Sequence, residues 1–338
     1  MSSQPSANNR GYAGLPIPFG WFAVAMSDEI AAGDVRTMKY FGKEFVMWRG
    51  EDEQLRAVDP YCPHLGAHLG VNSNVEGNDL RCPFHHWTFN GEGGVTGIPY
   101  TKVIAPSMKR SCLPSWPVQE SAGVVYVWYH PRKEAPKWEL AQLPRCIEDG
   151  ADIGDWVPAG RHEWVIDIHI QEITENGQDH AHFAAVHGVP GAPSAEFKLD
   201  GWQRRNMVVA EMNTPRGPMT GTIDITAVGP GQSITEYTDV THVLQVQQAT
   251  PIDAEHTQIR WQLYHAPGIS DGRMRVAQAR MRDLAKQIEQ DIPIWNQKVF
   301  LEKPLLVQGD GPLLAYRRQY AKFYADPVAV ENTAVAAE

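Results

Sequence analysis

Two short loops early in the sequence each contain one cysteine and one histidine. Cys62 and His64 lie in YCPHLGAHLG, and after 17 further residues Cys82 and His85 lie in RCPFHHWTF. Thiolates and imidazoles together bind either Zn²⁺ or an iron–sulfur cluster. Zinc fingers usually take their cysteines from one loop and their histidines from another. One of each per loop instead favours a [2Fe–2S] cluster, with two cysteines on one iron and two histidines on the other.

A second group of polar residues lies in ENGQDHAHFAAVH, residues 175–187. Asn176, Asp179 and His182 recur at intervals of three, which places them on one face of a helix predicted over Glu172–Val186. His187 follows near its end. Two imidazoles and a carboxylate from elsewhere in the chain form the 2-His-1-carboxylate site of non-haem Fe(II) enzymes. The alternative is a polar helix face with solvated histidines.

A later helix offers a candidate for that carboxylate. It is predicted to start at about Asp271, with Ser270 as its N-cap. One face repeats apolar residues at steps of three, four and seven, namely Met274, Ala277, Met281, Leu284, Ile288 and Trp295. Asp291 occupies the missing position, where a charge is costly unless it is paired or binds a metal. Asp291 is therefore the predicted third ligand, although Ile292 could continue the stripe instead. Trp295 either lines a substrate pocket or only packs in the core.

The two groups of residues lie in halves of different character. Short strands broken by Gly, Pro and Asp over residues 15–135 indicate an all-β domain, and the Pro- and charge-rich stretch 131–144 predicts a linker. The second half combines the two helices with alternating strands, predicted at Thr220–Val228, Ser233–Gln248 and Thr257–His265. The expected fold class is α+β, with a β domain at 15–135 and a helix–sheet–helix domain at 136–330.

Composition and charge exclude several other classes. The 338 residues carry a formal net charge of −10, so the basic surface typical of nucleic-acid-binding proteins is missing. The longest apolar run, about Ala122–Tyr129, is shorter than the roughly 20 residues of a membrane span. Met1–Gly14 lacks the pattern of a signal peptide, which predicts a cytoplasmic protein. Segments 1–14 and 331–338 are expected to be a flexible arm and tail.

The two motifs together resemble the Rieske non-haem iron oxygenases, over about residues 15–325. The similarity within that family points to the oxygenase component of 3-ketosteroid 9α-hydroxylase, through GWFAVAMSDEI, YCPHLGAHLG, ENGQDHAHF, EQDIPIW and DGPLLAYRRQYAKFYAD. It implies an all-β Rieske domain followed by a helix-grip, START-like catalytic domain with an antiparallel sheet around a long helix. One departure is His86, where the family usually has Gly. A left-handed backbone there would cost a histidine about 1 kcal/mol.

The resemblance also implies roles for the candidate residues. The implied metal ligands are Cys62, His64, Cys82 and His85 for the [2Fe–2S] cluster, and His182, His187 and Asp291 for a mononuclear Fe(II). Asp179 would bridge an iron-ligand histidine to a cluster histidine of the neighbouring subunit, so that a homotrimer is part of the mechanism. Asn176 is expected just behind the iron ligands.

The activity that follows from the resemblance is that of a terminal oxygenase. A separate flavin and iron–sulfur reductase, or a ferredoxin, would supply electrons from NAD(P)H, and O₂ would be the co-substrate. The predicted reaction is monooxygenation of a C–H bond in a small, hydrophobic, polycyclic, steroid-like substrate. Alternatives are a cis-dihydroxylating dioxygenase acting on aromatic rings and a Rieske O- or N-demethylase. Two other classes need only the first motif, namely a Rieske electron carrier and a zinc-stabilised binding module.

Overall fold

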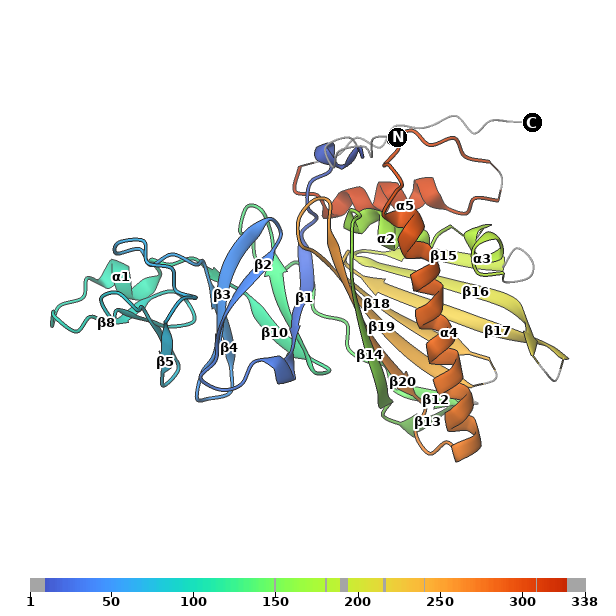
Figure 1. The fold of residues 1–338 in the computed structure, drawn as a ribbon, viewed down its shortest axis with the longest axis horizontal. Coiled ribbons are helices and arrows are strands. Elements are labelled where there is room, and N and C mark those ends of the chain that lie inside the picture. The colour runs from blue at the N-terminus through green and yellow to red at the C-terminus, as the bar shows by residue number, and fades with distance from the viewer. Residues whose placement is uncertain are drawn as a thin grey trace, which may run out of the picture. The chain divides into compact units, whose positions relative to one another are not determined.

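The computed structural model describes residues 10–148, 150–179, 181–188, 194–214, 217–239, 241–307 and 309–326. These residues form two compact units, of which one is Trp21–Lys137 and the other comprises the described residues on both sides of it (Figure 1). The break after Lys137 falls inside the stretch predicted as a linker. The tail predicted at 331–338 lies outside the described residues.

The unit Trp21–Lys137 contains three antiparallel sheets and one short α-helix. The first sheet has the order β1 (Gly20–Met26), β11 (Val124–Tyr129), β10 (Val118–Ser121). The second has the order β2 (Val35–Tyr40), β3 (Lys43–Arg49), β4 (Leu55–Val58), β9 (Ser115–Trp116). The third consists of β5 (Asn74–Glu76), β6 (Asp79–Arg81), β7 (Thr88–Phe89) and β8 (Val95–Gly97), and the helix is α1 (Pro106–Arg110). Strands such as β11 are formed by β-branched and aromatic residues, which favour this structure. The predicted all-β domain is confirmed.

The second unit is built on a seven-stranded antiparallel sheet. Its order is β14 (Val157–Ile166), β20 (Thr257–His265), β19 (His242–Pro251), β18 (Gln232–Thr238), β17 (Gly217–Val228), β16 (Gln203–Thr214), β15 (Ser194–Asp200). Helix α4 (Asp271–Trp295) runs across one face of the sheet (Figure 1). Near the C-terminal end of α4 lie three shorter helices, α2 (Ile170–Asn176), α3 (Ala181–Ala185) and α5 (Leu313–Tyr320). A small hairpin joins β12 (Cys146–Glu148) to β13 (Ala151–Gly154). The predicted sheet around a long helix is confirmed.

The long helix α4 begins where the sequence predicts. The Ser270 hydroxyl accepts a hydrogen bond from the backbone N–H of Arg273, as an N-cap does. The predicted apolar face packs into the core against side chains of the sheet, among them Val243, Ile259 and Trp261. Asp291 is the one charged residue among the buried positions of this helix. The stripe therefore does bury a carboxylate, although Ile292 also packs partly against the core.

Two elements differ from the prediction. The helix predicted over Glu172–Val186 is two helices, α2 and α3. The first helix ends at Asn176 in a tight turn, in which the Asp179 N–H donates a hydrogen bond to the Asn176 carbonyl. The Asp179 carboxylate then accepts a hydrogen bond from the His182 N–H, as the residue before a new helix does. The three polar residues therefore do not share one helix face. The strand predicted over Ser233–Gln248 is likewise two strands, β18 and β19, since the Asp239 carboxylate accepts a hydrogen bond from the Thr241 N–H and closes a turn.

The N-terminal segment also differs from the loose arm that was expected. Residues 1–9 lie outside the described part of the chain, but Arg10 and Tyr12 are buried in the second unit. The Arg10 guanidinium donates hydrogen bonds to the carbonyl oxygens of Lys298, Asp167 and Trp295. These bonds fix the end of α4 to the segment that precedes α2. Within the described residues, no helix has the length and apolar character that a membrane crossing requires.

Candidate metal centres

The two Cys–His loops of the first unit have the same backbone hydrogen-bond pattern. The Cys62 N–H donates to Ala67 O at 2.9 Å, and the Gly66 N–H donates to Cys62 O at 2.9 Å. In the second loop, the Cys82 N–H donates to Trp87 O at 2.8 Å and the His86 N–H donates to Cys82 O at 3.2 Å. Each loop therefore turns back on itself in the same way, with the cysteine on the inner side of the turn.

Gly66 and His86 occupy equivalent positions in this pattern, and both have positive φ, at 74° and 58°. The left-handed conformation suspected at His86 is therefore present. Glycine adopts it without strain, whereas a histidine pays about 1 kcal/mol. The His86 side chain is exposed.

The four side chains of these loops converge. The thiols of Cys62 and Cys82 are buried and lie next to each other, while the rings of His64 and His85 are half-buried with centroids 4.7 Å apart. Burial, together with the neighbouring Cys82, raises the pKa of the Cys62 thiol to about 11. Two thiols forced together in a buried place are costly as anions, and iron offsets that cost because it binds the thiolate. The donor set, two sulfurs inside and two imidazoles outside, fits a [2Fe–2S] cluster.

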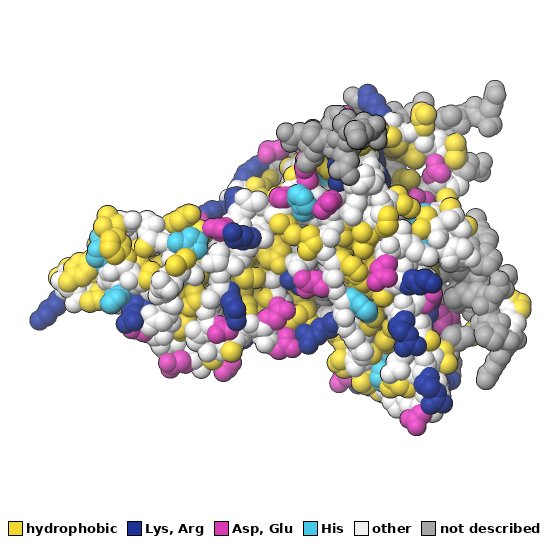
Figure 2. All heavy atoms as spheres, in the orientation of Figure 1, with side chains coloured by type: hydrophobic (Ala, Val, Ile, Leu, Met, Phe, Trp, Pro, Cys, Tyr) yellow, Lys and Arg dark blue, Asp and Glu magenta, His cyan; other side chains and the backbone are white. Residues whose placement is uncertain are grey.

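The histidine side of this group reaches the surface. Large apolar side chains beside the two rings are strongly exposed, namely Leu65, Phe84 and Tyr100. Figure 2 shows hydrophobic side chains next to histidine at the tip of this unit, while acidic and basic side chains are interspersed over the rest of the face drawn. One ring is also fixed from behind, because Trp87 stacks on His64 at 4.5 Å and donates its indole N–H to the Tyr100 hydroxyl at 2.7 Å.

His182, His187 and Asp291 meet in the second unit, although they come from three different segments. One ligand atom of each lies within 4.8 Å of the others, and the Asp291 carboxylate is 3.5 Å from His187 Nε2. Two imidazole nitrogens and one carboxylate oxygen at such separations fit the facial triad of a mononuclear Fe(II), which leaves further coordination positions open. The structure thus brings together the three residues that the sequence proposed.

The outer nitrogen of each ring has a hydrogen-bond partner. His182 Nδ1 contacts the backbone carbonyl of Asp179, and His187 Nδ1 lies 3.0 Å from Gln290 Oε1. Each Nε2 therefore points toward the shared centre, as in metal sites whose ligands are oriented from outside. Burial lowers the pKa of His187, but the Asp291 carboxylate and the Gln290 oxygen outweigh it, so that this pKa lies above its usual value. The surroundings of His187 and Asp291 therefore favour a positive charge.

Asn176 contacts two members of the triad. Its Nδ2 donates to Asp291 Oδ2 at 3.1 Å and lies 3.3 Å from His182 Nε2, so it lies beside the ligands rather than behind them. Asp179 differs from expectation within this chain, because it reaches the His182 ring through its carbonyl, while its carboxylate accepts from the His182 backbone N–H. Sequence reasoning missed Gln290, and its position next to Asp291 was the only signal.

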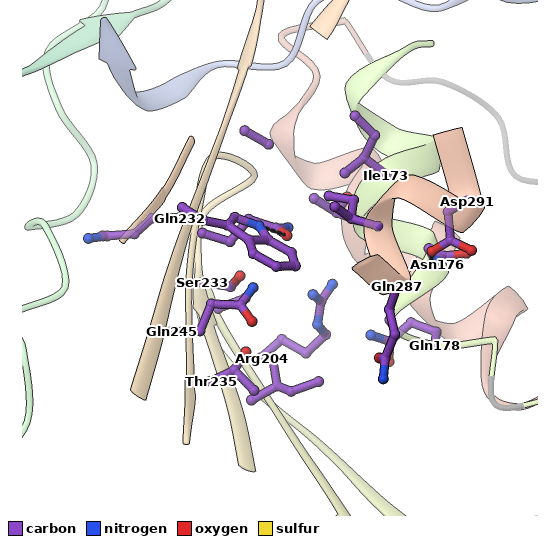
Figure 3. Close-up of a pocket in the computed structure, with 18 of the residues that line it drawn as sticks. Ile173, Asn176, Gln178, Arg204, Gln232, Ser233, Thr235, Gln245, Gln287 and Asp291 are labelled. Carbon is purple, nitrogen blue, oxygen red and sulfur yellow. Dashed lines mark hydrogen bonds between the residues drawn. The ribbon is translucent and has the colours of Figure 1, made fainter. Parts of the chain in front are cut away.

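A cavity of about 150 Å³ adjoins the triad. Figure 3 shows it between the sheet, which contributes Arg204, Ser233 and Gln245, and helix α4, which contributes Gln287 and Asp291. Its apolar wall includes Ile173, Leu284, Ile288 and Trp295. Trp295 therefore both lines the cavity and belongs to the core. Since ligand pockets commonly measure about 300–1,000 Å³, side chains must move apart to admit a polycyclic molecule.

Comparisons with known proteins cover both units. Residues 127–324 match the family described as the 3-Ketosteroid 9alpha-hydroxylase C-terminal domain, and residues 20–117 match the Rieske [2Fe-2S] domain. The cholesterol 7-desaturase nvd of Bombyx mori is 30% identical, over 96% of this chain and 74% of its own length. The probable 3-ketosteroid-9-alpha-monooxygenase, oxygenase component, of Rhodococcus rhodochrous is 29% identical, over 91% of this chain and 80% of its own length.

Solved structures resemble the chain over nearly its whole length. Dicamba monooxygenase bound to dicamba gives a TM-score of 0.66 at 17% identity, covering 90% of this chain and 96% of that one. The NdmA QL mutant of Pseudomonas putida CBB5 with caffeine gives a TM-score of 0.67 at 18% identity, covering 89% of this chain and 90% of that one. At such identities the likeness establishes a shared fold and no shared substrate.

Proposed function

We propose that this chain, which belongs to the Rieske oxygenases with a 3-ketosteroid 9alpha-hydroxylase C-terminal domain, oxidises a C–H bond of a steroid or sterol. Membership confirms the predicted enzyme class, a Rieske non-haem iron oxygenase with a [2Fe–2S] cluster and a mononuclear iron site. The observation that carries the proposal is the meeting of His182, His187 and Asp291 at the wall of a cavity with an apolar side.

The proposal assigns the metal ligands by residue. They are Cys62, His64, Cys82 and His85 for the cluster, and His182, His187 and Asp291 for the single iron. When bound, the cluster relays electrons and the ferrous ion activates O₂. The chain's own contribution is orientation: Gln290 and the Asp179 carbonyl direct both Nε2 atoms inward, and the buried Asp291 supplies the negative charge that holds a cation there.

Hydroxylation is the reaction we favour, with desaturation as the second candidate. The two relatives named above carry these two activities in their names, a monooxygenase and a 7-desaturase. Either reaction would need a C–H bond held beside the iron that His182, His187 and Asp291 would bind, so the same triad would serve both. Dihydroxylation of an arene and demethylation remain as further outcomes of the assay below.

Electrons would reach the iron from the cluster of another subunit, across Asp179. Asp179 is half-buried, and its carboxylate is held by the His182 backbone N–H at 3.3 Å. A residue so close to a ligand histidine is suited to link that ligand to a neighbouring chain. We therefore propose a homotrimer that receives electrons from a separate reductase or ferredoxin.

Incubation with a reductase, NADH and a panel of steroids, sterols and arenes tests the proposal, with products identified by mass spectrometry. Gain of one oxygen atom in a steroid supports hydroxylation, and loss of two hydrogen atoms supports desaturation. Gain of two oxygens and two hydrogens in an arene would instead support the dioxygenase, and loss of a methyl group the demethylase. Iron and sulfide contents of an electron carrier, without any product, would contradict the proposal.

A further inference from the structure

Arg204 is a cation that faces the cavity beside the triad. It lies on strand β16, where successive side chains point to opposite sides of the sheet. The next residue, Arg205, is on the exposed side and forms an ion pair with Asp224, with Nε 2.9 Å from Oδ1. Arg204 points the other way and extends from the sheet into the cavity (Figure 3).

Arg204 lacks the carboxylate partner that a buried arginine normally has. The residue is 8% exposed, and its Nε has no hydrogen-bond partner. Its guanidinium carbon lies 5.0 Å from the centre of the Tyr316 ring, and burial lowers its pKa. Among the residues that the structure describes, no Asp or Glu forms an ion pair with it. The Tyr316 side chain is a neutral partner of the guanidinium. A buried charge without an anionic partner is unfavourable, so an anion is expected to complete the site.

Two further donors with no partner line the same cavity. Gln178 is 0% exposed; its Oε1 accepts from Asn206 Nδ2 at 2.8 Å, which leaves its Nε2 hydrogens unpaired. Tyr320 is 1% exposed and its hydroxyl has no hydrogen-bond partner. Burial holds the pKa of Tyr320 well above its usual value, so this hydroxyl keeps its proton and can donate. Buried polar groups are normally paired.

Two other polar side chains of the cavity, Gln245 and Gln247, already have partners. Gln245 Oε1 accepts from the Tyr237 hydroxyl at 2.9 Å, and Gln247 Oε1 accepts from the Trp261 indole at 2.9 Å. The unpaired groups of Arg204, Gln178 and Tyr320 in this cavity are donors, whereas the side-chain oxygens of Gln245 and Gln247 are occupied. A ligand that satisfies the unpaired groups must bring oxygen acceptors, and the charge of Arg204 favours a carboxylate, which takes bidentate bonds from a guanidinium.

We propose that Arg204, with Gln178 and Tyr320, binds a carboxylate on the polycyclic substrate, so that the preferred substrate is a steroid acid rather than a neutral sterol. The apolar wall formed by Ile173, Leu284, Ile288 and Trp295 would cover the ring system. The inference deepens the proposed function and rests on it, because it specifies the substrate of the same cavity.

The test compares a tetracyclic steroid carboxylic acid with its methyl ester and a matched neutral ketone. Binding to the iron-loaded protein is measured by isothermal titration calorimetry without a supply of electrons. We expect the wild type to bind the acid at least about tenfold more tightly than either neutral ligand, as one charged hydrogen-bonded contact provides. Arg204→Met should abolish the difference, and Tyr320→Phe should weaken binding of the acid alone. Arg205→Met, the same substitution on the opposite face, should keep the preference.

Melting temperature and cluster spectrum report whether each variant folds. If Arg204→Met does not fold, Arg204→Lys keeps the charge but not the bidentate geometry and should lose part of the preference. Equal binding of acid and ester by the wild type, or tighter binding of the ketone, would overturn the inference while leaving an active oxygenase intact. Binding of the acid that depends on Arg204, without oxidation of any steroid, would support the carboxylate site and contradict the proposed function.

Discussion

Replacing Gln290 tests whether the iron site depends on the outer nitrogen of His187. Gln290 Oε1 lies 3.0 Å from His187 Nδ1, and the opposite nitrogen, Nε2, lies 3.5 Å from the Asp291 carboxylate. Without this partner the ring can rotate and change tautomer. Loss of such a hydrogen bond typically lowers metal affinity by about 10–100-fold.

The structure places Gln290 at the weaker end of that range. Its side chain is neutral and the residue is exposed, so that water partly replaces the lost bond. We expect Gln290→Ala to weaken Fe(II) binding by about tenfold, or about 1.4 kcal/mol. Gln290→Glu should strengthen Fe(II) binding, because a carboxylate accepts a stronger hydrogen bond from His187 Nδ1 and makes His187 Nε2 more basic.

Competition with a chromophoric Fe(II) chelator measures both effects at a fixed pH. The visible spectrum of the [2Fe–2S] cluster serves as an internal control, since it should not change in either variant. Glu289→Ala, a substitution at the adjacent exposed position of the same helix, should leave Fe(II) affinity unchanged. The reasoning fails if Gln290→Ala binds Fe(II) as tightly as the wild type, or if the alanine and glutamate variants shift in the same direction.

Three further predictions concern the triad and its support. His182→Ala should abolish turnover and keep the cluster spectrum; loss of that spectrum would argue against two separate sites. Asp179→Asn should keep both metals but slow oxidation of the reduced cluster in a single turnover, and a normal rate would exclude the bridge. Arg317 forms a buried two-point ion pair with Glu175, at 2.7 and 2.8 Å. Arg317→Met leaves that carboxylate unpaired, so urea unfolding should show a loss of about 3–5 kcal/mol; a loss below about 1 kcal/mol would show that the carboxylate finds another partner.

Features that depend on neighbouring residues could be predicted from the sequence. The spacing of Cys62, His64, Cys82 and His85 already indicated a cluster, because each half of the site is a loop whose backbone closes on itself. The long helix was equally evident, since its apolar positions repeat with the period of a helix and Ser270 caps its start. Asp291 was identifiable for the same reason, as the one position at which the apolar pattern is broken by a charge.

Features that depend on distant segments were decided only by the tertiary structure. The division of the helix predicted over Glu172–Val186 was missed because the spacing of polar and apolar residues does not reveal that Asp179 caps a second helix. Gln290 acquires its role only when α4 lies against His187. Arg204 and Arg205 are indistinguishable as neighbours in a strand, and the sheet alone determines that one meets Asp224 at the surface while the other enters the cavity. Local spacing thus defines the metal-binding motifs, whereas the packing of helices against the sheet selects which polar side chains surround the substrate.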